Sequence, residues 1–370
     1  MSMQSDIVLA PEALPQRILR RNGLLLALIA AHLAVTAAIA EGLGAHFDLG
    51  TFRALSMLFG LLMPAFLTLV VVWRFLVMAA TVRPQRPIRW FFNDLRGLFL
   101  DGERVLEGGA VLLALTLFTG AFSFLKTLIP VLNPFSWDPT FAHLDKLLHG
   151  GVAPELLLMR VFGHPLAVTV LNAAYQGWFF VMFFTIFVAC FSTRDRAARA
   201  TVLVAFVLTW ALGGNLLATV FSSAGPVYYG RLGFGHEYDA LTATLAAFNK
   251  VSPVWSLEVQ QMLWDGYLGR GPVAGISAFP SMHVASTTLI ALYAMRRGRL
   301  AGWLAAGFLL MIALAAVILA WHYAVDVYAG ATLALVFWAL AAKLTGDTAP
   351  WGVRRAARRA ARAVAQAVAK

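Results

Sequence analysis

The sequence contains few of the residues on which soluble domains and metal clusters depend. Only one of its 370 residues is cysteine, Cys190, which lies inside an apolar run and excludes an intramolecular disulfide or a cysteine-rich metal cluster. Charged residues are also scarce, at 13%, while 60% of the residues are hydrophobic. Ordinary soluble domains are roughly 45–50% apolar. The composition therefore excludes an ordinary soluble domain and indicates a chain whose solvent is the bilayer.

Eight apolar runs approach or reach the length of about 20 residues that a helix needs to cross a bilayer. They cover residues 22–40, 55–80, 108–130, 166–191, 200–221, 282–295, 300–321 and 325–342. The sixth and eighth are short and adjoin polar stretches, as expected where a helix end faces protein or a water-filled cleft. The first run lacks a cleavage site and is expected to remain as a span. The sequence thus predicts an all-α polytopic membrane protein with about eight transmembrane helices.

The distribution of basic residues predicts how the chain is oriented. With the N-terminus inside, 21 of the 29 lysines and arginines fall in inner segments, 7 fall in outer segments, and Arg74 lies within a span. Cytoplasmic loops carry such an excess of positive charge. We expect an integral protein of a bacterial inner (plasma) membrane with both termini in the cytoplasm. The net charge of +11 does not indicate nucleic-acid binding, because the basic residues separate apolar runs and do not gather on one domain.

Three parts are expected along the chain. Residues 1–105 form a leader plus two transmembrane helices, 106–345 form the core, and 346–370 form a basic cytoplasmic tail. The core has two long outer loops, of which 131–165 is expected to hold a short amphipathic helix at the interface and 222–279 to pack as a cap. The tail either lies as a basic helix on the inner leaflet or is a frayed end without a function of its own.

Two polar stretches, residues 278–283 and 321–326, stand at the ends of apolar runs. Between them the chain crosses the bilayer, turns through basic residues 296–299 and crosses back, which returns both stretches to the same, extracytoplasmic side. His322 and Asp326 are four residues apart, so on a helix they share a face and the carboxylate can orient the imidazole. The alternative for this pair alone is a set of ordinary interface residues.

The first stretch contains a helix-start pattern of proline followed by serine. Ser281 is expected to cap the helix, whose free N–H groups attract a phosphate, and His283 then lies beside that anion. The alternative is a capping serine with an incidental histidine. Together the residues suit phosphoryl transfer without a metal: His322 attacks to form a phosphohistidine, Asp326 orients it, His283 protonates the leaving oxygen, and Ser281 contacts the phosphate.

Four segments of the chain resemble a known family. The strings Pro-Ser-Met-His at 280–283 and His-Tyr-Ala-Val-Asp-Val at 322–327 resemble the second and third signature motifs of the phosphatidic acid phosphatase type 2 superfamily. The longer segments 275–285, 225–229 and 144–150 are similar to the branch that contains inositol phosphorylceramide synthase. The resemblance covers roughly residues 106–345 and implies a six-helix lipid phosphatase/phosphotransferase core with the two histidines and the aspartate at its outer face.

The resemblance is incomplete in two places. The superfamily's first motif, a lysine separated by six residues from arginine-proline, has no counterpart, and the arginine six residues before the third-motif histidine is replaced by Ala316. Phosphate contacts must then come from elsewhere. The candidates are Tyr228, Tyr229 and Arg231, with Lys250 and Arg270 as weaker ones. For the tyrosines the alternative is an interfacial aromatic belt.

The remaining histidines, at positions 32, 46, 143, 149, 164 and 236, lack metal-ligand spacing, and no acidic cluster suits Mg²⁺. A zinc site made by His283, His322 and Asp326 is the alternative to the anion site. We expect no metal and no cofactor.

The expected substrate is a membrane lipid with a phosphate or phosphodiester head group, and the expected acceptor is water, an alcohol or a polyol. The alternative is a non-catalytic lipid transporter or scramblase that uses the same polar site to bind a head group. The sequence does not give an oligomeric state.

Overall fold

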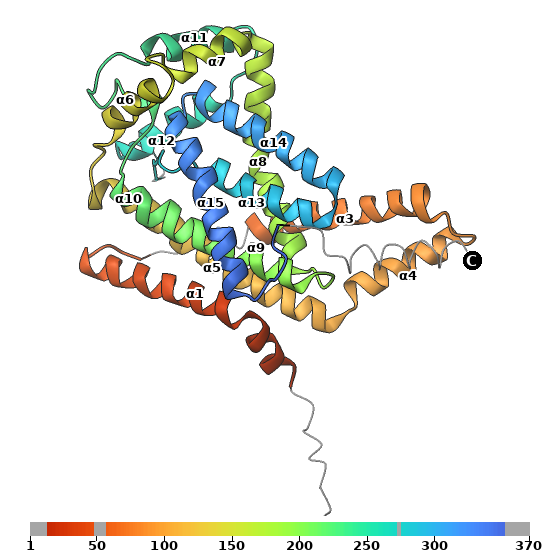
Figure 1. The fold of residues 1–370 in the computed structure, drawn as a ribbon. Helices are drawn as coiled ribbons and strands as arrows, with labels where there is room; N and C mark the ends of the chain where they lie inside the picture. Colours follow the sequence, from red (N-terminus) through yellow and green to blue (C-terminus); the bar gives the residue numbers. More distant parts are fainter. Residues whose placement is uncertain (1–12, 48–56, 272–274, 352–370) are drawn as a thin grey trace, which may run out of the picture.

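The computed structural model describes residues 13–47, 57–271 and 275–351, and these residues form helices and turns without a β-strand (Figure 1). The predicted N-terminal leader up to residue 12, the basic tail from residue 352 and a short part of the second long loop, residues 272–274, lie outside the described residues. The all-α prediction is confirmed for the described part of the chain.

Seven helices in the described residues are long and apolar enough to cross a membrane. They are α1 (Leu14–Gly42), Gly60–Val82, α5 (Gly102–Leu132), α8 (Pro165–Cys190), Arg196–Val220, α14 (Arg299–Ile318) and α15 (Ala324–Leu344). The span Gly60–Val82 combines most of η1 (Leu58–Leu62) with α3 (Met63–Val77) and η2 (Met78–Val82). The span Arg196–Val220 combines α9 (Arg196–Leu208), η3 (Thr209–Leu217) and α10 (Ala218–Val220). The chain is an integral membrane protein.

The remaining predicted span, 282–295, is the helix α13 (Met282–Arg297), whose 16 residues are fewer than a full crossing needs. It packs against α14, α15, α9 and α8 and lies in the centre of the bundle (Figure 1). Because protein surrounds it on several sides, α13 can begin and end with polar groups that lipid would not tolerate.

Shorter helices cover one end of the bundle (upper left in Figure 1). They are α6 (Asp138–Leu148), α7 (Pro154–Phe162), η4 (Pro226–Tyr228), α11 (Asp239–Asn249) and α12 (Ser256–Tyr267). The expected interfacial helix of loop 131–165 thus appears as two helices, and loop 222–279 is largely helical. At this end lie the start of α13, the end of α14 and the start of α15, with His283 and His322. We call it the histidine end.

The opposite end is held by buried ion pairs. Glu107 of α5 lies 2.9 Å from Arg199 of α9, and Asn22 of α1 donates a hydrogen bond to the same carboxylate. Arg296, at the end of α13, pairs with Asp347 at 2.7 Å and with Asp195 at 3.1 Å. These contacts join α1, α5, α9 and α13. The predicted boundary between residues 105 and 106 falls inside α5, so the first part of the chain and the core share a helix.

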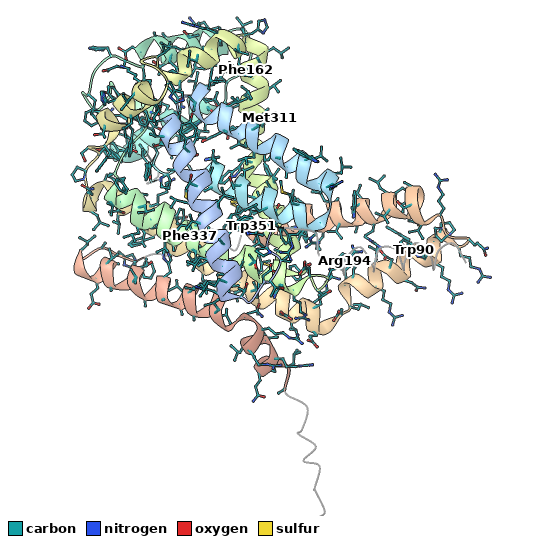
Figure 2. All side chains as sticks on the ribbon, in the orientation of Figure 1. Trp90, Phe162, Arg194, Met311, Phe337 and Trp351 are labelled. Atoms are coloured by element: carbon teal, nitrogen blue, oxygen red, sulfur yellow. The ribbon has the colours of Figure 1, made fainter. Side chains whose placement is uncertain are left out.

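The helices α3 and α4 (Pro87–Phe99) form a hairpin that projects from the bundle (Figure 1). Arg74 donates a 2.6 Å hydrogen bond to Asp94 across the hairpin, and its guanidinium lies 5.7 Å from the ring of Trp90. Figure 2 shows Trp90 on this projecting part, away from the bundle. No residue of α4 is buried, so the helix depends on the hairpin contacts and on its surroundings.

Candidate active site

The two histidines that the topology predicts to meet lie side by side at the histidine end. The ring centroids of His283 and His322 are 6.2 Å apart, and both rings line one cavity. His283 is in the first turn of α13, whereas His322 is in the short connection between α14 and α15. The antiparallel return of the chain through α14 is what brings the two side chains together.

The turn after α14 fixes the position of His322. The carbonyl of Ala316 accepts hydrogen bonds from the amides of both Trp321 and His322, at 3.1 and 3.0 Å. This closure requires a left-handed residue, and Ala320 has a φ of 59°. A non-glycine residue rarely adopts this conformation, and such residues gather at functional sites. The end of α14 is therefore wound back on itself so that His322 faces the cavity.

A glycine allows α15 to lie directly against the start of α13. A Cβ atom at Gly330 would be only 2.5 Å from the carbonyl oxygen of Ser281. The amide of Ser281 in turn donates a 3.0 Å hydrogen bond to the carbonyl of Asp326. The two polar stretches, residues 278–283 and 321–326, are thus joined through their backbones as well as facing one cavity.

The imidazole of His322 is oriented mainly by a backbone carbonyl. Its Nδ1 lies 2.8 Å from the carbonyl oxygen of Ala278 and 3.5 Å from Oδ2 of Asp326. Only a protonated Nδ1 can bond a carbonyl, which leaves the lone pair on Nε2. Asp326 Oδ2 accepts a 2.9 Å bond from the amide of Tyr323. The carboxylate expected to orient the ring is adjacent, but the short bond to the ring comes from Ala278.

The environment of His322 keeps the imidazole neutral. Burial lowers the pKa of His322 to about 3, the hydrogen bond to Ala278 opposes this change, and the positive charge of Lys126 lowers the pKa further. A neutral imidazole with a free nitrogen is the form that attacks an electrophile. When His322 gains a substituent and a positive charge, the buried carboxylate of Asp326 is the nearest compensating group. Asp326 Oδ1 is buried and has no hydrogen-bond partner among the described residues.

His283 is held between two aromatic rings of α8. Its ring lies 4.1 Å from that of Tyr175, with 15° between the planes, and 4.0 Å from that of Trp178. These contacts fix the plane of the imidazole without using either ring nitrogen. Both nitrogens therefore remain able to exchange a proton with a ligand.

Among the described residues, one cationic side chain lines the cavity with the histidines, and the cavity has a volume of about 490 Å³. Lys126 of α5 lies on its wall and forms no hydrogen bond or ion pair with any described residue. Lys126 is only partly exposed, and an ammonium in a largely apolar cavity without a partner is costly; an anion bound between Lys126 and the histidines would remove that cost. The carbonyl of Lys126 lies against Gly275, where a Cβ atom would approach it to 2.5 Å. Lys126 had no predicted role in the site, although a lone charge in an apolar run is itself a functional signal.

Comparison with protein families identifies the part of the chain that holds the histidines. The family model described as the PAP2 superfamily matches residues 139–340, more than half of the chain. The chain belongs to the PAP2 superfamily. Searches of curated proteins and of solved structures find no match. The match includes His283, His322 and Asp326 but begins at residue 139, so Lys126 of α5 lies outside it.

Members of the PAP2 superfamily are generally phosphoric ester hydrolases. Together with the seven membrane helices, membership gives the chain the general class of a membrane lipid phosphatase or phosphotransferase. Within the described residues, no group of three histidine, cysteine or acidic side chains is arranged to hold a metal ion.

The second PAP2 motif includes a serine whose position is structural. Ser281 is fully buried, and its hydroxyl accepts a 3.4 Å bond from the amide of Val284 as the N-cap of α13. It is not among the residues that line the cavity. The expected capping role is therefore observed. A phosphate contact by this hydroxyl remains a prediction, and it would require a different rotamer.

Of the five remaining phosphate candidates, one lines the cavity, and the two weaker ones, Lys250 and Arg270, do not. Tyr228 is 1% exposed, and its hydroxyl donates a 2.9 Å hydrogen bond to the carbonyl of Gln260, so it can still accept a bond from a ligand. Tyr229 is buried against Tyr238, with ring centroids 5.3 Å apart, and does not line the cavity. Arg231 lies 5.6 Å from the ring of Trp264, also outside the lining.

Two buried carboxylates of α6 hold the PAP2 core together beside the site. Asp138 accepts hydrogen bonds from the amides of Ala224 and Gly225 and a 2.9 Å bond from the hydroxyl of Tyr323. Burial raises the pKa of Asp138, and these three donors oppose that rise. The aspartate thus fixes the loop that leads to Tyr228. Sequence reasoning assigned it no role, because nothing local indicates its distant partners.

Asp145 acts in the same way on α15. Its two carboxylate oxygens accept bonds of 2.7 and 2.9 Å from the amides of Ala324 and Val325, the first residues of that helix. Burial raises the pKa of Asp145, and the two amide donors lower it. Asp145 belongs to the segment 144–150 whose similarity to the synthase branch was noted from the sequence. Through Asp145, that segment fixes the start of α15, the helix that carries Asp326.

Proposed function

We propose that this protein transfers a phosphoryl-linked head group of a membrane lipid through a phosphohistidine on His322. One observation carries the proposal: two histidines and an unpaired lysine face the same cavity, and one histidine has its Nδ1 bonded and its Nε2 free. The phosphate groups of membrane lipids are almost always anionic. A bound phosphate or phosphodiester therefore supplies the negatively charged partner that the ammonium of Lys126 lacks.

The first chemical step follows from these positions. Nε2 of His322 attacks phosphorus, and the bond from phosphorus to the leaving oxygen breaks. That oxygen takes a proton from His283, and the negative charge of the bound phosphate favours the protonated form that this step requires. Lys126 contacts the non-bridging oxygens, and the hydroxyl of Tyr228 can join it by turning its hydrogen from the carbonyl of Gln260 to the phosphate. Asp326 balances the positive charge on the substituted His322.

The second step returns the enzyme to its starting state. An acceptor hydroxyl loses its proton to His283, its oxygen attacks phosphorus, and the bond from phosphorus to Nε2 of His322 breaks. Water as acceptor gives a phosphatase, whereas an alcohol or polyol gives a transferase. We propose an alcohol or polyol, as in inositol phosphorylceramide synthase, because the cavity wall is largely aromatic and aliphatic and keeps bulk water away. The same distribution of basic residues that predicts the topology supports an extracytoplasmic site.

The test is an assay of the purified full chain with lipid phosphates and phosphodiesters, with and without inositol or glycerol as acceptor. We expect a new phosphodiester when the acceptor is present, and loss of at least about a thousandfold in turnover in His322→Ala, because that variant lacks the nucleophile. Rapid acid-free quenching of a labelled reaction should leave phosphate on the wild type and none on His322→Ala.

Other outcomes assign other functions. Release of free phosphate alone would make the protein a phosphatase. Lipid movement between leaflets that persists in His322→Ala, with no chemical product from the wild type, would replace the enzyme by a carrier. Loss of turnover on addition of EDTA would refute a reaction that needs no metal.

A further inference from the structure

The cavity extends far beyond the residues needed for phosphate chemistry. Near the histidines its wall includes polar groups, among them Lys126, Ser123 and Gln176. Further along the same helices the wall becomes apolar, with Leu112 and Leu115 on α5 and Met182, Phe183 and Ile186 on α8. One continuous space therefore has a polar end and an apolar end.

The dimensions of the apolar part match a hydrocarbon tail. From Lys126 to Leu112 the wall follows 14 residues of α5, which is about 21 Å of helix at roughly 1.5 Å per residue. Half of the hydrocarbon core of a bilayer is about 15 Å thick. A lipid whose phosphate lies at Lys126 can thus place one tail along the whole chamber. The polar groups of α5 in this part are the hydroxyls of Thr116 and Thr119, which already donate hydrogen bonds to backbone carbonyls of the helix.

The apolar end is bounded by a span that lies outside the segment matched by the PAP2 superfamily. Leu62, the last residue of η1, is 2% exposed and lines the cavity. One helical turn later, Phe66 of α3 packs against Phe184 and Phe187 of α8, with ring centroids 6.2 and 5.0 Å apart. The second span thus packs on the stretch of α8 that contains Ile186, and Leu62 and Ile186 line the same cavity.

We propose that this chamber binds one hydrocarbon tail of the lipid substrate and that Leu62 sets the length of tail that fits. The proposal rests on the proposed function and gives a role to the second N-terminal span. The lipid is recognised at both ends: by charge at Lys126 and by length at Leu62. A helix outside the segment matched by the family would then determine specificity while leaving the reacting groups unchanged.

The neighbouring leucine provides a matched control. Leu61 is in the same π-helical segment but is 55% exposed and does not line the cavity. Leu61→Trp and Leu62→Trp therefore add the same side chain to adjacent positions, one facing away from the chamber and the other facing into it. Leu62→Ala is the complementary change, because it removes volume from the end of the chamber.

The experiment measures kcat/KM for diacyl phosphatidic acids from dioctanoyl to distearoyl, presented in the same detergent. We expect Leu62→Trp to lower the ratio of distearoyl to dioctanoyl turnover by about tenfold, within the range by which apolar pockets discriminate size. Leu62→Ala should raise the ratio, and Leu61→Trp should leave it at the wild-type value. Equal ratios in the wild type and in both Leu62 variants would overturn the proposal.

A binding measurement separates this proposal from the proposed function. Native mass spectrometry can follow distearoyl phosphatidic acid bound to His322→Ala and to the double variant His322→Ala/Leu62→Trp, neither of which needs to turn over. Weaker retention by the double variant supports the tail chamber even if the wild type hydrolyses no lipid. Equal retention overturns the tail chamber even if the wild type is an active enzyme.

Discussion

Replacement of Lys126 by methionine tests the electrostatics of the site most directly. Methionine keeps most of the length and apolar volume of the lysine stem but removes the ammonium group. If this ammonium holds the phosphate, then Lys126→Met leaves the histidines in place and removes the only cation that lines the cavity among the described residues. We expect the variant to fold and to bind and turn over lipid poorly.

The size of the loss follows from the surroundings of the charge. Two unit charges about 4 Å apart attract by roughly 4 kcal/mol at an effective dielectric constant of about 20. Removal of one preorganised donor to a developing oxyanion costs about 2.7–4 kcal/mol, or roughly a hundred- to a thousandfold in rate. The two figures agree, so kcat/KM should fall by about a hundred- to a thousandfold.

The pH profile distinguishes this electrostatic role from a structural one. The charge of Lys126 helps to lower the pKa of His322, so its removal raises that pKa. A nucleophile acts in its neutral form, and the acid limb of kcat/KM should therefore move to higher pH in Lys126→Met. Lys126→Arg should retain the wild-type limb because it retains the charge.

The control is Lys250→Met, which changes an exposed lysine at the end of α11 that does not line the cavity. It should behave as wild type. If Lys126→Met retained kcat/KM within about threefold, or lost activity with an unchanged acid limb, the assignment of Lys126 to the phosphate would be wrong.

Three further substitutions test the framework around the site. Asp145→Asn should lower kcat with little change in KM and should lower the melting temperature. The change replaces the acceptor of one of the first two amides of α15, and a buried amide without an acceptor costs about 1–3 kcal/mol of stability. Unchanged kcat would refute a positioning role. Gly330→Ala should abolish activity because its methyl group meets backbone at the start of α13, whereas Gly307→Ala on α14, where a Cβ atom meets nothing within 4 Å, should be silent in the same assay. Glu107→Ala should destabilise the fold by roughly 3–5 kcal/mol, because it leaves the buried Arg199 without its carboxylate partner. Glu103→Ala removes a partly exposed ion pair and should cost about 1 kcal/mol or less. Similar unfolding midpoints for the two variants would contradict this difference.

Periodicity and length were sufficient to predict the helical class and the position of the spans. The run at 282–295 shows why the number of spans was less certain. A helix of 16 residues is too short to cross alone, yet α13 is stable because other helices surround it. Hydropathy reports how a segment interacts with lipid, and α13 is packed largely against protein.

The site was predictable only where neighbours in sequence or a simple return path decide the geometry. His283 and His322 meet because one helical hairpin connects them, and their proximity follows from counting crossings. The roles of Ala278 and Asp138 depend on contacts between distant segments, which no local pattern specifies. Lys126 was the avoidable omission, because a charge inside an apolar run is informative by itself.

The anion site is assembled from two parts of the chain that are distant in sequence, α5 on one side and the α13–α15 hairpin on the other. A bound phosphate therefore acts as a cross-link between helices. Ligand that binds only the folded protein adds about 2.7 kcal/mol of stability at a hundred times its dissociation constant. Preparations of the empty protein should accordingly lose α5 from the bundle more readily than loaded ones, and inorganic phosphate in the buffer should preserve the enzyme during storage.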